Sequence, residues 1–161
     1  MYFIKFAILF SVKILFVCHA NICRSFMAQE ICKKLLPQAE VFSRGIYANP
    51  SYEIPAKVTN FLSSQGVTPA SHVSTQLTEG DLSQADLIFC MEQKHLNRLL
   101  DHYAQYTPKL WLLNDFAFEK ETDLEDPISL SGRAFIKQAV KLQKAVEASA
   151  TKIKQKYGEN K

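Results

Sequence analysis

A cysteine, an arginine and a serine near the start of the chain have the spacing of a phosphate-binding catalytic loop. Cys18 and Arg24 enclose five residues, and Ser25 follows. A loop of this length can curl so that its backbone N–H groups point at one centre, and at a helix start such a nest binds anions. That field favours the thiolate form of Cys18. Arg24 offers a planar fork to two phosphate oxygens, and Ser25 can donate a hydrogen bond to the sulfur. The pattern predicts a thiolate that attacks the phosphorus of a phosphate monoester.

The spacing alone is weak, because Cys-x5-Arg arises by chance in about one chain in ten of this composition. A cysteine that ends a buried strand is also often just a small core residue. The neighbouring segments favour the catalytic interpretation: an apolar strand is predicted over 12–17, and an amphipathic helix over 25–36.

An aspartate far downstream completes the chemistry. Asp126 lies between Glu125 and Pro127, and it could protonate the leaving group of phosphotyrosine and later accept a proton from water. Pro127 biases Asp126 toward an extended conformation. Asp-Pro by itself indicates only a turn, so its meaning comes from being paired with the cysteine loop.

Strands and helices alternate along the chain. Strands are predicted over 12–17, 40–42, 87–91 and 109–113, and helices over 25–36, 55–65, 78–83, 93–103 and 131–157. This order predicts an α/β fold: a single-domain, four-stranded parallel sheet with helices on both faces and the phosphate-binding loop after strand one. The carboxyl ends of parallel strands share one edge, so Cys18 and Asp126 can reach one pocket.

Other polar residues receive weaker interpretations. Glu92, after the third strand, either braces Arg24 or caps the next helix. His95 and His102 are predicted on the exposed side of that helix, and His19 is expected to point to solvent, so none of the three is given a catalytic role.

Composition sets limits on partners and location. The chain has 161 residues, is 47% hydrophobic, and carries a net charge of +3, which fits one domain with a real core and is too weakly basic to indicate nucleic acid. Its four cysteines lack the spacing of a zinc site, so we expect no metal. A reactive thiol needs a reducing compartment, so we expect a cytoplasmic protein without a membrane partner.

The first eleven residues are apolar but are interrupted by Lys5. They are too short for a membrane span, and signal cleavage near Ala20 would remove Cys18. We expect residues 1–11 to be an N-terminal extension outside the core fold or the product of an upstream start, with a surface-packed tail as the alternative. The phosphatase-like domain is predicted over 12–157, and a short tail over 158–161.

Taken together, the motifs resemble the low-molecular-weight protein tyrosine phosphatases from about Val12 to Tyr157. The matching segments, in order, are residues 17–25, 42–45, 72–77, 85–92 and 126–127. The resemblance implies that Cys18 is the nucleophile, Arg24 the phosphate clamp and Asp126 the general acid and base. It implies a phosphate-binding loop made of Cys18, His19, Ala20, Asn21, Ile22, Cys23 and Arg24, supported by Asn21, Ser25, Ser43 and His72. Asn21 also suits a left-handed backbone position.

The resemblance extends to a redox partner and a pocket wall. Cys23 resembles the second loop cysteine of the family, whose reversible disulfide with the nucleophile would protect Cys18 from irreversible oxidation; a buried inert thiol is the alternative. Ile128 stands where the family usually has an aromatic residue, and Phe26 where it often has proline. The aromatic pocket wall is then Tyr47 or Tyr52, together with Ile128.

The predicted function is hydrolysis of phosphotyrosine in proteins through a phosphocysteine intermediate, without metal or cofactor. The implied partners are a tyrosine-phosphorylated protein, a tyrosine kinase that supplies it, and inorganic phosphate as product. Three alternatives remain. A phosphoarginine phosphatase has Thr at the place of Ile22. An arsenate reductase needs a downstream cysteine pair, whereas Cys90 stands alone. A non-catalytic phosphopeptide-binding module would not need Cys18, Arg24 and Asp126 intact.

Overall fold

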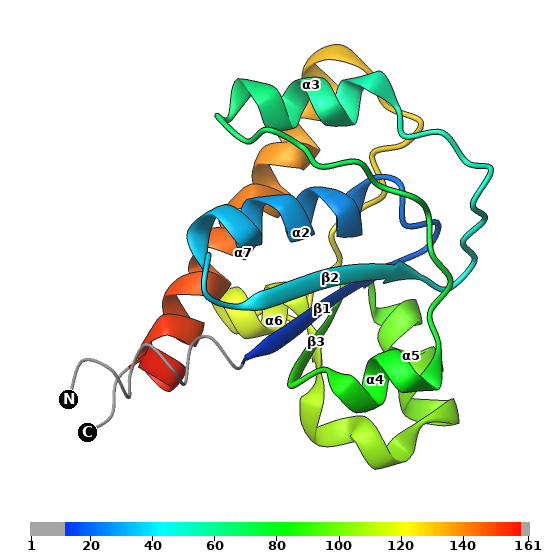
Figure 1. Ribbon diagram of the computed structural model, residues 1–161, viewed down its shortest axis with the longest axis vertical. Helices are drawn as coiled ribbons and strands as arrows, with labels where there is room; N and C mark the ends of the chain where they lie inside the picture. The colour runs from blue at the N-terminus through cyan, green and yellow to red at the C-terminus, as the bar shows by residue number, and fades with distance from the viewer. Residues whose placement is uncertain (1–11, 159–161) are drawn as a thin grey trace.

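The computed structural model describes residues 12–158, and the expectations for 1–11 and for the end of the tail lie outside that range. Its centre is a four-stranded, all-parallel sheet (Figure 1). The strands are β1 (Lys13–Cys18), β2 (Glu40–Gly45), β3 (Leu87–Cys90) and β4 (Leu110–Leu112), in the spatial order β2-β1-β3-β4. The predicted fold class is confirmed.

Helices cover both faces of the sheet. They are α2 (Arg24–Leu35), α3 (Ala56–Ser64), α4 (Glu79–Gln84), α5 (Gln93–His102), α6 (Leu113–Phe118) and α7 (Gly132–Gly158), with a 3-10 helix η1 (Ala104–Lys109) before β4. Figure 1 shows α2 above the sheet and α4 and α5 below it, and α7 packs with α2 on the same side. The helices therefore form the outer two of three layers, which is the arrangement that a buried parallel sheet requires.

Alternation along β1 explains why this strand is apolar throughout. Ile14 and Phe16 join the core cluster that includes α2 and α7, whereas Leu15 and Val17 join the cluster that includes α4 and α5. All four side chains are fully buried. The strand is thus held from both sides, and its carboxyl end presents Cys18 at a fixed place.

Several boundaries differ from those expected. β2 continues to Gly45 instead of ending at Phe42, because it pairs residue by residue with β1 as far as Cys18. The segment 42–45 therefore belongs to β2. The elements η1 and α6 were not predicted; α6 has six residues and buries only Leu113 and Ala117, too few to show a helical period.

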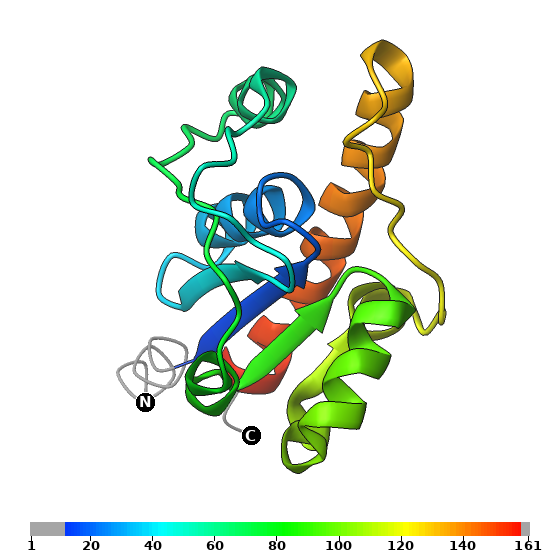
Figure 2. The ribbon, with the colours of Figure 1, turned by 90° about the vertical axis from the view of Figure 1, so that its right-hand side faces the viewer.

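The connection between α6 and α7 is long and contains no helix or strand (Figure 2, yellow). It carries Asp126. Within residues 12–158, no helix is both long enough and apolar enough to cross a membrane.

Candidate active site

The loop between β1 and α2 is curled by hydrogen bonds to its carbonyl groups. Four consecutive carbonyls accept hydrogen bonds from other segments: Cys18 from Ile46 N (3.0 Å), His19 from Tyr47 N (2.8 Å), Ala20 from Ser74 Oγ (2.7 Å) and Asn21 from His72 Nε2 (2.8 Å). The C=O and N–H of a peptide group point in opposite directions. Turning these carbonyls outward therefore turns the following N–H groups toward the centre of the loop, which makes an anion-binding nest.

Asn21 is the residue around which this loop turns. It is fully buried and has a φ of 57°, the left-handed conformation that asparagine tolerates. Its Oδ1 accepts a hydrogen bond from Thr75 N (3.0 Å), which identifies the amide nitrogen as the atom facing Ser25 Oγ (2.8 Å) and Ser43 Oγ (2.9 Å).

The donor and acceptor roles in this network determine which group faces the sulfur of Cys18. Ser43 Oγ donates to Gln29 Oε1 (2.7 Å) and accepts from Asn21. Ser25 Oγ also accepts from Asn21, so its own proton is free for Cys18 Sγ at 2.9 Å. The network therefore offers the sulfur a hydrogen-bond donor, which stabilises a thiolate.

Gly45 makes the close approach of β2 to this loop possible. A Cβ atom at this position would lie 2.9 Å from the carbonyl oxygen of His19 and 3.0 Å from the Cβ of Asn21. Both contacts are with the loop itself, so no flexible side chain can move aside. Any larger residue would push the loop away from the sheet.

His72 holds the loop from outside. Because a carbonyl only accepts, Nε2 must carry the proton that it donates to Asn21 O. The ring of Phe26 stacks on the imidazole at 4.2 Å between centroids, which gives a role to the residue that replaces the family's usual proline. Burial lowers the pKa of His72, partly offset by the Asn21 hydrogen bond, and so favours the neutral tautomer.

Arg24, at the first position of α2, is buried and held on two sides. Its Nη1 donates to Glu92 Oε1 (2.5 Å) and to the carbonyl of Leu124 (2.7 Å). Burial alone would raise the pKa of Glu92, but the Lys94 hydrogen bond and the Arg24 charge outweigh it and lower that pKa. Glu92 is thus an anion that fixes the guanidinium through Nη1, while Nη2 lies on the side of the catalytic cavity, near Asp126. Of the two interpretations of Glu92, the brace for Arg24 is the one observed.

Asp126 reaches the same cavity from the connection that follows the edge strand β4 and α6. Its Oδ2 lies 3.4 Å from Arg24 Nη2, and its Oδ1 accepts a hydrogen bond from Ile128 N (3.1 Å) across Pro127. The loop is anchored where Leu124 N donates to Met91 O (2.8 Å). On the other side, Nζ of Lys57 from α3 donates to the carbonyls of Ile128 and Leu130.

These groups share one cavity of about 100 Å³. It is lined by Cys18, His19, Ala20, Ile22, Cys23, Arg24, Asp126 and Ile128. The predicted nucleophile, clamp and acid therefore meet. Of the predicted wall residues, Ile128 lines this cavity, Tyr47 lines a neighbouring groove, and Tyr52 is exposed and borders neither.

Cys23 borders the same cavity from the start of α2. Burial, and next the nearby Cys18 charge, raise its pKa to about 12. At neutral pH Cys23 is therefore an un-ionised thiol, which is a poor nucleophile.

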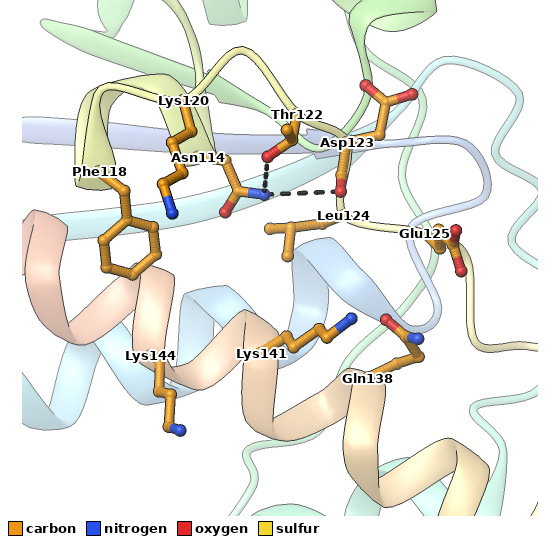
Figure 3. Close-up of a pocket in the computed structure, with 10 residues that line it drawn as sticks. All are labelled: Asn114, Phe118, Lys120, Thr122, Asp123, Leu124, Glu125, Gln138, Lys141 and Lys144. Atoms are coloured by element: carbon orange, nitrogen blue, oxygen red, sulfur yellow. Dashed lines mark hydrogen bonds between the residues drawn. The ribbon is translucent and has the colours of Figure 1, made fainter.

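The loop that carries Asp126 also borders a second cavity, of about 340 Å³ (Figure 3). This cavity lies between residues 120–125 and α7, and Leu124 extends into it. The hydrogen bonds drawn there join Asn114 Nδ2 to Thr122 Oγ1 (3.1 Å) and to Asp123 O (3.5 Å). The cavity therefore flanks the loop, while the buried Leu124 side chain joins it to the main core cluster.

Sequence reasoning missed several supporting groups. Gln29 and Thr75 complete the hydrogen bonds of Asn21 and Ser43, and the carbonyl of Leu124 binds Arg24. A backbone carbonyl such as that of Leu124 is present in every residue, so the sequence cannot indicate its role. Lys57 lies near the start of a predicted helix, but nothing in the neighbouring sequence indicates that it binds the loop that carries Asp126. His95, expected on the surface, is buried.

Comparisons with known proteins agree with this geometry. The family described as low molecular weight phosphotyrosine protein phosphatase matches residues 13–159. A probable low molecular weight protein-tyrosine-phosphatase of Ralstonia nicotianae, EpsP, is 30% identical over 141 residues, which cover 88% of this chain and 95% of that protein.

Two solved structures are also similar. Wzb of Vibrio vulnificus, in complex with benzylphosphonate, has a TM-score of 0.79 and 33% identity, covering 88% of this chain and 98% of that one. The YwlE arginine phosphatase of Geobacillus stearothermophilus has a TM-score of 0.84 and 27% identity, covering 90% and 94%. The chain belongs to the low molecular weight phosphotyrosine protein phosphatase family.

Proposed function

We propose that the protein hydrolyses phosphotyrosine in proteins, with Cys18 as nucleophile, Arg24 as phosphate clamp and Asp126 as general acid and base. The observation that carries the proposal is that these three side chains, from β1, α2 and the connection before α7, line one small cavity. Membership in the family supports the same chemistry.

In the first step the Cys18 thiolate attacks phosphorus, and the bond from phosphorus to the tyrosine oxygen breaks as the S–P bond forms. The inward N–H groups of the loop and Nη2 of Arg24 bind the phosphoryl oxygens as their charge is redistributed. Ser25 Oγ, 2.9 Å from the sulfur, stabilises the attacking thiolate.

The leaving phenolate takes a proton from Asp126. A phosphate dianion bound to Arg24 shares the cation that otherwise faces Asp126 at 3.4 Å. The carboxyl of Asp126 lines the same cavity as Cys18, so it lies within reach of the leaving oxygen, to which a general acid gives its proton.

In the second step water hydrolyses the phosphocysteine. Asp126, now a carboxylate, accepts a proton from the water as it attacks phosphorus, and the S–P bond breaks to return the Cys18 thiolate and release inorganic phosphate. Both steps are complete with the side chains of this cavity and water.

The cavity favours an aromatic ester. Ile22 and Ile128 line it with apolar side chains, and Cys18 is buried, with 3% of its surface exposed. A planar ring can extend between such walls and still bring its phosphate to the sulfur, whereas a short phosphoserine side chain cannot reach as far.

Arginine phosphatase activity is the second candidate function. The likeness to YwlE favours it, and the apolar side chain of Ile22 opposes it.

The natural partners in this proposal are a tyrosine-phosphorylated protein and the kinase that phosphorylates it. A thiolate nucleophile works in a reducing compartment, so we place the protein in the cytoplasm. Cys23, next to Cys18 in the cavity wall, is the proposed redox partner: it would displace water from a peroxide-formed Cys18 sulfenic acid to give a disulfide that thiols can reduce.

Phosphate release tests the proposal. Matched peptides that contain phosphotyrosine, phosphoserine or phosphoarginine are incubated with wild type and with Cys18→Ser in the presence of EDTA. Release from phosphotyrosine alone, lost in Cys18→Ser, is expected. A preference for the phosphoarginine peptide would show that the substrate is phosphoarginine and not phosphotyrosine. Release that Cys18→Ser retains would remove Cys18 as the nucleophile.

A further inference from the structure

A groove adjoins the catalytic cavity on the side of α5. It has a volume of about 510 Å³ and runs between the end of β2 and α5. His19 lines both this groove and the catalytic cavity, so the two are neighbours across one side chain. A peptide whose phosphotyrosine enters the cavity must continue over the rim that His19 forms.

The α5 side of the groove presents positive charge. Lys94 and Arg98 lie one turn apart on the same face of the helix. Arg98 is held in place: its Nη1 donates to Tyr47 Oη at 2.7 Å, and its guanidinium lies 5.1 Å from the centre of the Tyr47 ring. An arginine ordered in this way loses less side-chain entropy when it binds an anion than a free one does.

His95 lies between these two cations in sequence and forms part of the groove wall. It is 4% exposed, and neither ring nitrogen has a hydrogen-bond partner among residues 12–158. A neighbouring ring is that of the exposed His19, 6.4 Å away between centroids. Both ring nitrogens of His95 are enclosed, so the charge of this groove wall comes from Arg98 and Lys94 and not from His95.

We propose that this groove binds the substrate chain next to the phosphotyrosine and that Arg98, assisted by Lys94, selects an acidic side chain there. The inference rests on the proposed phosphotyrosine activity and names its substrate class: phosphotyrosine with Asp or Glu close in sequence. Charge complementarity of this kind raises the rate of productive encounter and opposes basic substrates.

The far end of the groove limits the preference. Asp101, one turn beyond Arg98, also lines the groove, so a carboxylate placed farther from the phosphotyrosine meets a like charge. The protein should therefore favour one nearby acidic residue over a long acidic run. Lys94 is already paired with Glu92 at 2.9 Å, which makes Arg98 the main contact.

Peptide kinetics test the inference. A host phosphotyrosine peptide with alanine flanks receives Glu, Gln or Lys at each of the two positions before and after the phosphotyrosine, and kcat/KM is measured at low salt. We expect Glu to exceed Lys by about fivefold on one side of the phosphotyrosine and the ratio to approach one at high salt.

Charge reversal separates recognition from a structural role. Arg98→Glu should reverse the preference toward the Lys peptide, an effect that mere loss of packing cannot produce. Lys154→Glu, at an exposed position of α7, is the matched control and should keep the wild-type ratio. If Arg98→Glu does not fold, Arg98→Met decides, with an expected ratio near one.

The outcomes are distinguishable from failure of the proposed function. Hydrolysis of 4-nitrophenyl phosphate, which has no flanking residues, reports that function in the wild type. Equal rates for Glu and Lys peptides, or an unchanged ratio in both Arg98 variants, would overturn the groove assignment while the phosphatase activity stands. An enzyme inactive on every phosphotyrosine substrate would overturn both.

Discussion

The loop that carries Cys18 and the loop that carries Asp126 face the same cavity but are held in different ways. Around Cys18, four successive carbonyls are bound by neighbouring segments, and Asn21 at the centre is fully buried. Asp126 has 37% of its side chain exposed, lies in a connection without helix or strand, and has a cavity next to its loop (Figure 3).

The difference separates two tasks. The phosphate-binding half is fixed before substrate arrives, so its N–H groups need no reorganisation during the reaction. The acid half is anchored by a backbone hydrogen bond at Leu124, and near Asp126 and Ile128 it is tied by two cations, Arg24 and Lys57. Its position can therefore respond to the charge of a bound phosphate, and four substitutions test this contrast.

The largest effect is expected where the acid acts. Asp126→Asn should lower kcat for a phosphotyrosine peptide by about 10²- to 10³-fold, because the phenolate leaves without a proton. For 4-nitrophenyl phosphate, whose leaving group is far less basic, the loss should be only about tenfold. Glu125→Gln, at the exposed neighbouring carboxylate, is the control and should be near wild type. Equal losses on both substrates would contradict the role of Asp126.

The next effect tests how rigid the phosphate loop is. Gly45→Ala should lower the free energy of unfolding by about 1–3 kcal/mol, because the new methyl group meets His19 O at 2.9 Å and cannot be accommodated. Urea unfolding measures this change. Gly80→Ala, whose Cβ would lie 3.6 Å from Thr78 Oγ1, should leave stability unchanged or slightly higher. A Gly45→Ala protein as stable as wild type would show that the loop can yield.

A buried histidine near the rigid half predicts a pH effect. Burial, and next the Arg24 charge, lower the pKa of His95 to about 4. The unfolded chain binds this proton near pH 6.5, whereas the folded chain binds it only near pH 4. The free energy of unfolding therefore decreases as the pH falls from about 6.5 to about 4. Between pH 7 and 5 the contribution is about 1–2 kcal/mol.

Urea unfolding at the two pH values measures that contribution as the difference between wild type and His95→Gln. The variant lacks the titrating group, so its stability should fall less on acidification, while His72 titrates equally in both proteins. Identical pH dependence in the two proteins would show that His95 is protonated as easily in the fold as outside it.

The smallest effect is expected at the second tie of the acid loop. Lys57→Met removes the ammonium that binds the carbonyls of Ile128 and Leu130, and kcat for phosphotyrosine should fall about threefold with KM little changed. Lys154→Met, at an exposed lysine of α7 away from this loop, should not alter kcat. A loss as large as that of Asp126→Asn would mean that the acid loop is as firmly required as the phosphate loop.

The same contrast explains what the sequence could predict. The phosphate loop is local: Cys18, Arg24 and Ser25 lie within eight residues, between an apolar strand and an amphipathic helix, so composition and spacing indicate both its place and its chemistry. The roles of Ser43 and His72 came only through resemblance to the family, because their contact with Asn21 spans 22 and 51 residues.

Other features could not be predicted from the sequence. Gly45 looks like any glycine until the carbonyl of His19 is seen against it. α6 is too short to show a period. His95 shares its helix with the exposed His102, and only packing of that helix beside the catalytic loop distinguishes the two. Such properties depend on tertiary contacts, which local pattern does not encode.

Trapping the covalent intermediate tests the central claim most directly. Wild-type protein is mixed with a phosphotyrosine peptide, quenched in acid within the first turnover, digested, and analysed by mass spectrometry. The account predicts one phosphoryl group on the peptide that contains Cys18, located on the sulfur and absent from Cys18→Ser. A phosphoryl group on any other residue, or steady turnover with no phosphorylated protein at any quench time, would contradict it.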